Sequence, residues 1–329
     1  MQAYRYENKA TGLVLENASI PEPNADQVLI AVEAVGLCHS DLHIISGRAK
    51  RITKKQTLGH EVAGTVVKLG SATSHLAQGD RVAVALILDG PGRQGWNKTI
   101  GLGYDGGYAA FATAYTSSVV KIPDNVSFGQ AAVATDSIAT AYCAVVGGAA
   151  ASASMTIGIL GLGGLGMNGV QIAALQGSKV YGIDIDEKKF KDAKHYGALE
   201  CFTSLDFATG IAFDAIVDFA GVGTTTREAV AAVKPLGCVV LVGLGAENTT
   251  INTAVLVGRK ITLKGSVSAS LKDFETVLQL ISSRRITPNL EEIPFSAVKE
   301  GLRRLHEGQV KGRLFTNPSK EPPKSLYKI

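Results

Sequence analysis

Two short segments of the sequence gather side chains that can bind a metal ion. The segment CHSDLH, residues 38–43, places a thiol, two imidazoles, a hydroxyl and a carboxylate side by side after an apolar run. The segment GHEVAGTV begins with Gly59, His60 and Glu61. A thiolate and a neutral imidazole are preferred zinc ligands, and a catalytic zinc needs three protein ligands and one open position. The two segments together make Cys38 and His60 candidate zinc ligands.

Each of these residues has a structural alternative. Cys38 alone could be a small buried hydrophobic residue, and His60 alone could be a packed or surface histidine. Their joint appearance favours the metal site. No further Cys or His lies in a clear motif, so the third ligand is less obvious; Asp136, in TDSI, is a candidate but could equally cap the next helix.

A glycine-rich segment predicts a nucleotide site. The apolar β run 156–160 leads directly into GLGGLG, which is followed by the helix-like MNGVQIAALQG. In this context Gly161 allows the tight turn, Gly163 lets the backbone approach a pyrophosphate, and Gly166 lets helix and strand pack closely. The helix N-terminus then attracts the anion. Without these flanks, GxGxxG could be a plain glycine-rich turn.

Asp184 bears on the choice of nucleotide. It follows a second β run, 179–183, at the distance of about 20 residues where a carboxylate bonds the adenosine ribose hydroxyls. Its charge would repel a 2′-phosphate, and Ile185 and Asp186 follow it where an Arg would be needed for that phosphate. The pattern favours NAD over NADP, although Asp184 could instead cap a turn.

The elements that must position these residues fall into two kinds. Roughly the first 125 residues contain short Val-rich runs broken by turn residues, which predict a mostly antiparallel β domain. From about residue 138, apolar β runs alternate with helical patterns, which predicts a doubly wound parallel sheet. LKDFETVLQLISSRRI has helical apolar spacing, and a further helix and a final strand follow it. We expect an α/β protein with domains 1–137, 138–267 and 268–329, the last returning to the first.

Composition limits the class of protein. The 329 residues include 46% hydrophobic and 19% charged residues, enough to fold as a two-domain globule. The net charge of +4 is small and its basic residues are scattered, so we expect no nucleic acid partner. The start lacks the pattern of a signal peptide, and no uninterrupted apolar run is long enough for a bilayer. With four separated cysteines, a cytoplasmic protein with reduced thiols and no membrane contact is expected.

Six motifs make a resemblance specific. CHSDLH, GHEVAG, GDRV, DGGYA, GLGGLG and KGR occur in the order seen in zinc-type alcohol dehydrogenases, and they cover most of the chain. The sequence therefore resembles the medium-chain dehydrogenase/reductase family. That resemblance implies a GroES-like catalytic domain and a Rossmann NAD-binding domain.

The resemblance also implies roles for single residues. Cys38 and His60 would bind zinc, Glu61 would tune or transiently bind it, and Asp136 would be the third ligand, because it stands four residues before the Thr of a TxY pattern. Ser40 and His43 would relay a proton to solvent, unless they only cap a helix and line a turn. The other predicted cofactor contacts are His39, Thr140, Gly164, Leu165, Lys189, Val242, Ser266 and Arg313. His39 and Arg313 resemble positions that contact the pyrophosphate, although either could be an ordinary surface charge.

One region departs from the family pattern. Many relatives have four closely spaced cysteines after GDRV that hold a structural zinc, but the segment between Val82 and Asp105 contains no cysteine. We therefore expect a single catalytic zinc and no structural one. The shortened segment, with Trp96, is expected to affect the substrate entrance or an oligomer contact.

The expected activity is interconversion of an alcohol with an aldehyde or ketone by hydride transfer to or from NAD(H). The main alternative is a zinc-free quinone or enoyl reductase of the same family using NAD(P)H, and a further one is a nucleotide-binding protein without catalysis. The intact ligand and relay residues disfavour both. The resemblance further implies a homo-oligomer, a dimer or a tetramer, acting on a small molecule.

Overall fold

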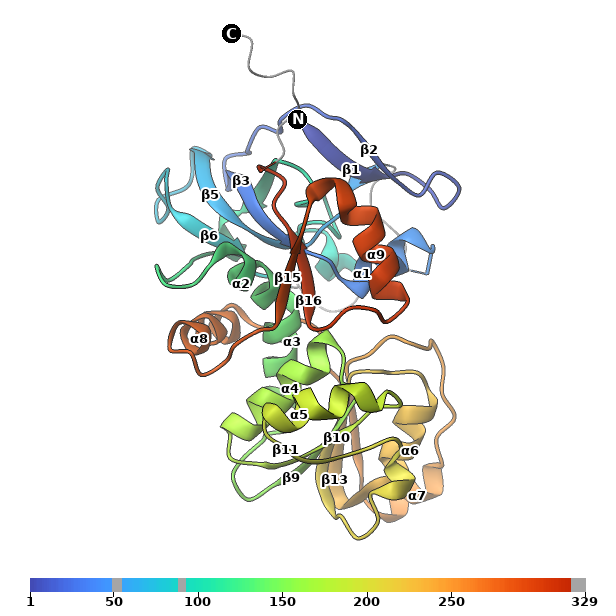
Figure 1. Cartoon of the computed structure of the whole chain (residues 1–329). Coiled ribbons are helices and arrows are strands. Elements are labelled where there is room, and N and C mark those ends of the chain that lie inside the picture. The colour runs from blue at the N-terminus through green and yellow to red at the C-terminus, as the bar shows by residue number, and fades with distance from the viewer. Residues whose placement is uncertain (49–54, 88–92, 321–329) are drawn as a thin grey trace. The chain divides into compact units, whose positions relative to one another are not determined.

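The computed structural model describes residues 1–48, 55–87 and 93–320, which form two compact units (Figure 1). The first unit comprises Met1–Asp136 and Ser270–Ile329, and the second comprises Ser137–Ala269. The expected ranges 1–137, 138–267 and 268–329 differ from this division by only one or two residues at each boundary. The two units are described separately below.

The first unit is built on mostly antiparallel sheets. A three-stranded sheet has the order β2-β1-β4, and a seven-stranded sheet has the order β15-β16-β3-β5-β6-β8, with β7 paired to β3. The strands are β1 (Gln2–Tyr6), β2 (Leu13–Asn17), β3 (Gln27–Gly36), β4 (Gln56–Thr57), β5 (Glu61–Leu69), β6 (Arg81–Val84), β7 (Phe111–Tyr115), β8 (Val119–Lys121), β15 (Leu290–Ile293) and β16 (Arg313–Thr316).

Strand β3 is the centre of the larger sheet. It pairs with β5, β7 and β16, and most of its residues are buried, which explains why its apolar run is nearly continuous. Because Phe315 pairs with Gly36, the end of the chain returns to the sheet that begins near its start. The helical segments of this unit are α1 (His39–Ile45), η1 (Arg93–Trp96), η2 (Thr116–Ser118), α2 (Phe128–Val133), η3 (Ala134–Ile138, which crosses the boundary), α8 (Leu271–Ser282), η7 (Phe295–Ala297) and α9 (Val298–His306).

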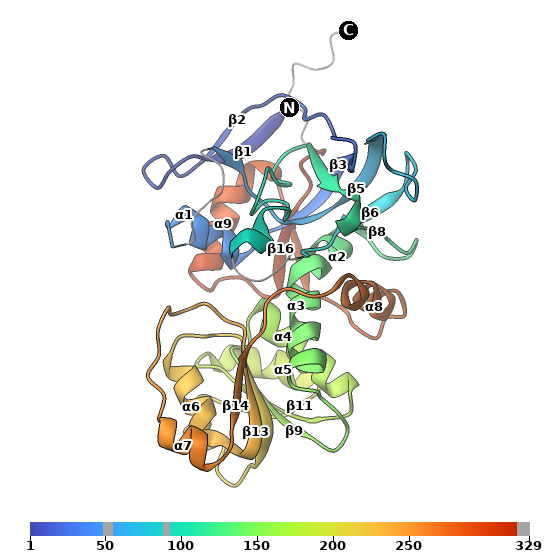
Figure 2. The same cartoon turned by 180° about the vertical axis from the view of Figure 1, so that it is seen from behind.

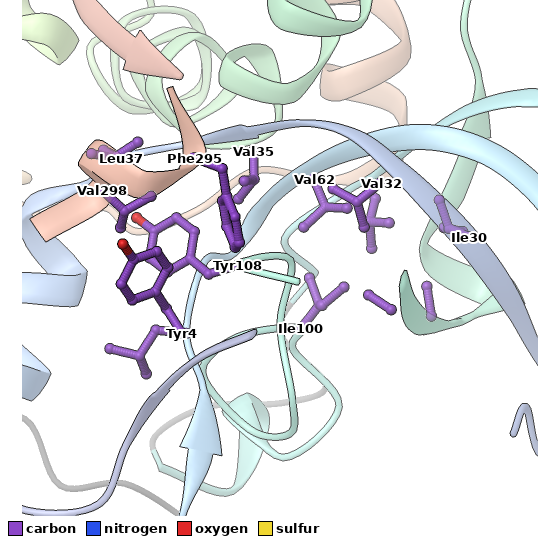
Figure 3. Packing of buried hydrophobic residues seen from close by; sticks show 14 of the residues in the cluster. Tyr4, Ile30, Val32, Val35, Leu37, Val62, Ile100, Tyr108, Phe295 and Val298 are labelled. Carbon is purple, nitrogen blue, oxygen red and sulfur yellow. The ribbon is translucent and has the colours of Figure 1, made fainter. Parts of the chain in front are cut away.

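The core of the first unit joins segments that are far apart in the sequence. Figure 3 shows the rings of Tyr4 and Tyr108 beside Phe295, Leu37 and Val298. All five are buried, and they come from both ends and the middle of the unit. Burial of such side chains contributes roughly 1.5–3 kcal/mol each. Leu37 directly follows β3, so this packing lies at the end of that strand.

The second unit is a parallel sheet with the order β11-β10-β9-β12-β13-β14 (Figure 2). If these strands are numbered from 1 in the order in which they occur along the chain, the sheet order is 3-2-1-4-5-6. This is the strand order of a doubly wound dinucleotide-binding sheet. The predicted fold class is therefore confirmed. The elements are α3 (Ala139–Tyr142), η4 (Cys143–Gly148), β9 (Thr156–Leu160), α4 (Gly164–Leu175), β10 (Lys179–Ile183), η5 (Glu187–Lys189), α5 (Phe190–His195), β11 (Ala198–Phe202), η6 (Leu205–Phe207), β12 (Phe213–Asp218), α6 (Thr224–Ala232), β13 (Val233–Leu241), α7 (Thr253–Gly258) and β14 (Thr262–Gly265).

Two apolar patterns of the sequence can be compared with the elements that they form. The apolar period of LKDFETVLQLIS correctly predicts α8, in which Phe274, Val277 and Ile281 are buried on one face. DRVAVALIL, one of the short Val-rich runs of the first 125 residues, is a strand over only part of its length, because β6 ends at Val84. The Ile87 N–H then donates to the Ala85 carbonyl at 3.1 Å and closes a tight turn. Leu88 lies outside the described residues.

One helical stretch of the described residues, Phe128–Gly148, has the length and apolar composition of a membrane span. Of its most apolar part, 67% is buried inside the protein. A core helix of a globular protein has these same properties, so the stretch is weak evidence for a membrane.

Candidate metal and dinucleotide sites

The predicted metal ligands come from three places in the first unit. Cys38 lies between β3 and α1 and is the N-cap of α1, His60 directly precedes β5, and Asp136 lies in η3. The ligand atoms of these residues and Glu61 all lie within 4.8 Å of one another. Among the residues that the structure describes, this is the one such group. The fold thus brings together side chains that the sequence separates by up to about a hundred positions.

One carboxylate oxygen is central to this group. The Cys38 thiol donates a hydrogen bond to Asp136 Oδ2 at 3.2 Å, and His60 Nε2 lies 3.5 Å from the same oxygen. Cys38 is 4% exposed and His60 is 1% exposed. A thiol, an imidazole nitrogen and a carboxylate oxygen therefore face each other in a nearly dry environment, which is a donor set that zinc prefers.

The His60 ring shows that the group fits a metal ion. Both ring nitrogens are buried and make no hydrogen bond. Burying such a group without a partner costs roughly 1–3 kcal/mol. Burial opposes protonation of His60, but Asp41, Cys38 and Asp136 outweigh it and raise the pKa of His60 well above its usual value. The same groups, Asp41, Cys38 and Asp136, would also stabilise a cation bound at Nε2.

Asp136 does not have the capping role that its sequence allowed. It lies inside the helical stretch formed by α2, η3 and α3, and the N-caps of α2 and α3 are Ser127 and Ile138. The segment η3 around Asp136 is π-helical, a distortion that is frequent at functional sites. The metal-ligand role remains a prediction, supported by the position of the carboxylate.

Glu61 and Arg313 form a buried ion pair beside the ligand group. Arg313 Nε donates to Glu61 Oε2 at 3.2 Å, its Nη2 pairs with Glu61 Oε1, and Nη2 also lies 3.4 Å from Asp136 Oδ2. Gly36 makes room for this pair, since a Cβ there would meet Glu61 Oε2 at 1.8 Å. Burial raises the pKa of Glu61, and the Arg313 cation opposes that rise.

This ion pair could not be inferred from the sequence. The predicted role for Arg313 was a pyrophosphate contact, whereas the structure places its guanidinium against Glu61 and Asp136. The two partners of the pair are 252 positions apart, and no local pattern links them. Glu61 is paired with the Arg313 cation, and it would have to break this pair to approach a metal. The phosphate role of Arg313 stays a prediction.

Asp41 and Tyr108 form a second buried contact behind His60. The Tyr108 hydroxyl donates to Asp41 Oδ2 at 2.8 Å, and Asp41 Oδ1 lies 3.5 Å from His60 Nδ1. Burial and the nearby Asp41 charge raise the pKa of Tyr108 well above its usual value, so its hydroxyl keeps its proton and donates. Neither residue was assigned a role from the sequence. The only indication in the sequence of a role at this site is that Asp41 lies three residues after Cys38.

The remaining predicted residues of this unit lie on α1. His39, Ser40 and His43 are in or at the start of the helix, and Ser40 and His43 are three residues apart, so they share a face. Ser40 Oγ lies 3.5 Å from Cys38 Sγ. Desolvation by neighbouring protein atoms and the Arg313 charge lower the pKa of His39 to about 4, although its ring still reaches solvent. His39 is therefore neutral at ordinary pH.

The glycine-rich segment in the second unit has the geometry expected of a phosphate loop. Gly161 has φ +84°, a conformation that favours glycine. A Cβ on Gly163 would meet nothing within 4 Å, whereas a Cβ on Gly166 would meet the Gly161 carbonyl at 1.8 Å. Gly163 is the N-cap of α4 without a side-chain cap, which leaves helix N–H groups available for an anion. Gly164 and Leu165 open that helix.

The other predicted cofactor residues of this unit lie at the ends of its elements. Asp184 follows β10, accepts the Leu162 N–H at 2.7 Å and pairs with Lys189 Nζ at 2.9 Å. Val242 follows β13 and Ser266 follows β14, so both share the carboxyl edge of the sheet with Asp184, where nucleotides bind in such folds. Thr140 is buried in α3. The cofactor roles of these residues remain predictions.

Comparison with known protein families gives two matches. Residues 24–124 match the alcohol dehydrogenase GroES-like domain, and residues 164–283 match the zinc-binding dehydrogenase domain. The first match contains Cys38, His60 and Glu61, and the second contains Asp184 and part of the glycine-rich segment.

Single proteins match nearly the whole chain. The NAD-dependent alcohol dehydrogenase of Sulfolobus acidocaldarius is 30% identical over 92% of this chain and 95% of its own length. The structure of acetophenone reductase from Geotrichum candidum in complex with NAD has a TM-score of 0.90 and 32% identity, covering 98% of each chain. A cobalt- and zinc-bound thermostable alcohol dehydrogenase from Pyrobaculum aerophilum has a TM-score of 0.88 and 26% identity, covering 97% of this chain and 99% of its own.

Proposed function

The chain belongs to the zinc-binding alcohol dehydrogenases of the medium-chain dehydrogenase/reductase family, and from this premise we propose that it interconverts an alcohol and an aldehyde or ketone with NAD(H), using one zinc ion. The ligands are Cys38, His60 and Asp136. The absence of cysteine between Val82 and Asp105 supports the expectation of no structural zinc.

The observation that carries this proposal is the buried group of ligand atoms around His60. A thiol, an imidazole and two carboxylates lie within 4.8 Å of one another, and both His60 nitrogens are buried without a hydrogen bond. A zinc-free reductase has no use for such a group, so this observation also disfavours the alternative activity. The NAD half of the proposal is supported by Asp184, whose charge would repel a 2′-phosphate.

The chemistry is divided between the bound groups and the chain. Zinc supplies a Lewis acid for the alcohol or carbonyl oxygen, and NAD supplies the hydride acceptor or donor. Burial of Cys38 and His60 excludes water from the ligand group, which strengthens every charge interaction there. Arg313 pairs with the Glu61 carboxylate, so Glu61 would have to leave that ion pair before it could bind the zinc that Cys38, His60 and Asp136 would hold. Ser40, 3.5 Å from Cys38 Sγ, begins the route by which a proton leaves.

His43→Ala tests the second member of that route. Partial burial and the Arg48 charge lower the pKa of His43, so its neutral, proton-accepting form persists to lower pH. We expect kcat for alcohol oxidation to fall about 10-fold near pH 6–7, less than the ~10²–10⁴ of a direct base because water can substitute. The loss should shrink at higher pH. The pH–rate profile is compared with that of His75→Ala, an exposed histidine; a profile like the parent's would remove His43 from the relay.

The proposal includes a cytoplasmic homo-oligomer. The four cysteines are free, which suits a reducing compartment. Strand β14 stands at one end of its sheet in the described chain, and its Thr262, Lys264 and Gly265 are exposed. Such an edge can pair with a second copy. We propose a dimer or tetramer of this kind.

A substrate panel tests the activity. Purified protein is assayed with primary, secondary and aromatic alcohols with NAD or NADP, and with the matching carbonyls with the reduced cofactors. We expect alcohol oxidation with NAD to exceed that with NADP, and light scattering of the same sample to give two or four copies. Reduction of activated C=C bonds with no alcohol oxidation would overturn the proposal. Such a panel also identifies the substrate class, which the sequence leaves open.

A further inference from the structure

Two residues outside the predicted ligand set lie directly behind His60. Asp41 is 0% exposed, and its Oδ1 lies 3.5 Å from His60 Nδ1. The opposite nitrogen, Nε2, faces Asp136. Nδ1 makes no hydrogen bond in the structure, but a carboxylate so placed can accept its proton when the ring binds a metal, so the groups that fix Asp41 bear on how the ring presents Nε2.

Among the described residues, Asp41 is held by N–H and O–H donors, and no Lys or Arg forms an ion pair with it. Its Oδ2 accepts the Cys38 N–H at 3.1 Å and the Tyr108 hydroxyl at 2.8 Å, while its Oδ1 faces the more distant Gly59 N–H at 3.4 Å. The Tyr108 contact is the shortest of the three. A buried carboxylate relies on such bonds, because burying an ionised group without them is costly.

Tyr108 is fixed from several sides. Its N–H donates to the Leu58 carbonyl at 2.9 Å, and its own carbonyl accepts the Tyr4 N–H at 2.8 Å. Its ring packs against Gly59, where a Cβ would meet the ring at 2.7 Å. Figure 3 shows this ring within the apolar core, next to that of Tyr4. The direction of its hydroxyl is thus set by the fold before any ligand binds.

We propose that Tyr108 is a positioning residue for the metal site: its hydroxyl orients Asp41, which holds His60 with the proton on Nδ1 and the lone pair of Nε2 toward the ligand group. This inference rests on the proposed zinc site. Partners of metal-bound histidines fix the ring and its tautomer in this way, and their loss weakens metal binding by about 10–100-fold. Tyr108 acts on His60 indirectly, through Asp41.

The test compares two buried tyrosines that each lose only a hydroxyl. Tyr108→Phe removes the bond to Asp41, whereas Tyr4→Phe removes a bond to the Ser296 carbonyl in the same core. The zinc dissociation constant is measured by competition with a chromophoric chelator, and the visible spectrum of the Co²⁺-substituted protein reports ligand geometry. We expect about 10-fold weaker zinc binding and a changed cobalt spectrum in Tyr108→Phe, and neither change in Tyr4→Phe.

A double-mutant cycle separates positioning from general core packing. In an Asp41→Asn background, Tyr108→Phe should weaken zinc binding little further, because the hydroxyl acts through the carboxylate. Equal zinc affinity of Tyr108→Phe and wild type, an equal loss in Tyr4→Phe, or the same loss with and without Asp41 would overturn the inference. A wild-type protein that binds no zinc would instead overturn the proposed function, so the two failures are distinguishable.

Discussion

Replacing His60 with alanine is expected to abolish zinc binding and to reduce alcohol oxidation by about 10³-fold or more, since a bound metal contributes several kcal/mol to charge stabilisation. The reason is geometric: His60 Nε2 is the imidazole nitrogen of the ligand group, and it lies within 3.5 Å of Asp136 Oδ2. NADH binding should persist, because the glycine-rich segment belongs to the second unit. Zinc content by mass spectrometry, steady-state turnover and NADH fluorescence titration measure the three effects.

Two controls make the His60 result specific. His60→Gln keeps most of the side-chain volume, so it separates loss of the ligand from the cavity that alanine leaves. It should lose zinc and turnover as well. His195→Ala changes an exposed histidine and should change neither. Full zinc content in either His60 variant would contradict the assigned ligand.

Asp136→Asn is expected to have the second-largest effect. It keeps the size of the side chain and removes the charge that faces Cys38, His60 and Arg313. Because changes to residues beyond the ligands already cost about 10–100-fold in metal affinity, loss of a ligand should exceed about 100-fold. The zinc dissociation constant is measured by chelator competition at fixed pH.

Asp136→Cys is the matched variant. Thiolate is a good zinc ligand, so this protein should retain zinc although it has lost the carboxylate. Asp206→Asn, on the surface of the second unit, serves as the neutral control. Wild-type zinc affinity in Asp136→Asn would show that another group completes the site.

Local sequence patterns predicted the second unit well. The strands Thr156–Leu160 and Lys179–Ile183 occur as predicted, since each is a short apolar run ended by a glycine-rich turn or by Asp184. The loop between them follows from glycine chemistry, because positions such as Gly161 need backbone conformations or close contacts that other residues disfavour. The fold class could therefore be predicted and is confirmed.

Contacts between distant segments could not be predicted in the same way. Nothing near Arg313 in the sequence indicates that it pairs with Glu61, because that contact depends on β16 returning beside β3. Nothing near Tyr108 indicates Asp41, because their contact depends on how residues 57–59 and 106–108 bond to each other. The sequence motifs indicate which residues can bind zinc. The charged and polar groups that surround those residues come together only in the fold.

The measurement that tests the central claim most directly is turnover of the purified protein with NAD and an alcohol as its metal is removed and restored. The zinc site predicts about one zinc per chain, loss of activity in step with zinc removal by a chelator, and recovery when zinc is added back. Undiminished alcohol oxidation by protein verified to be metal-free would contradict it.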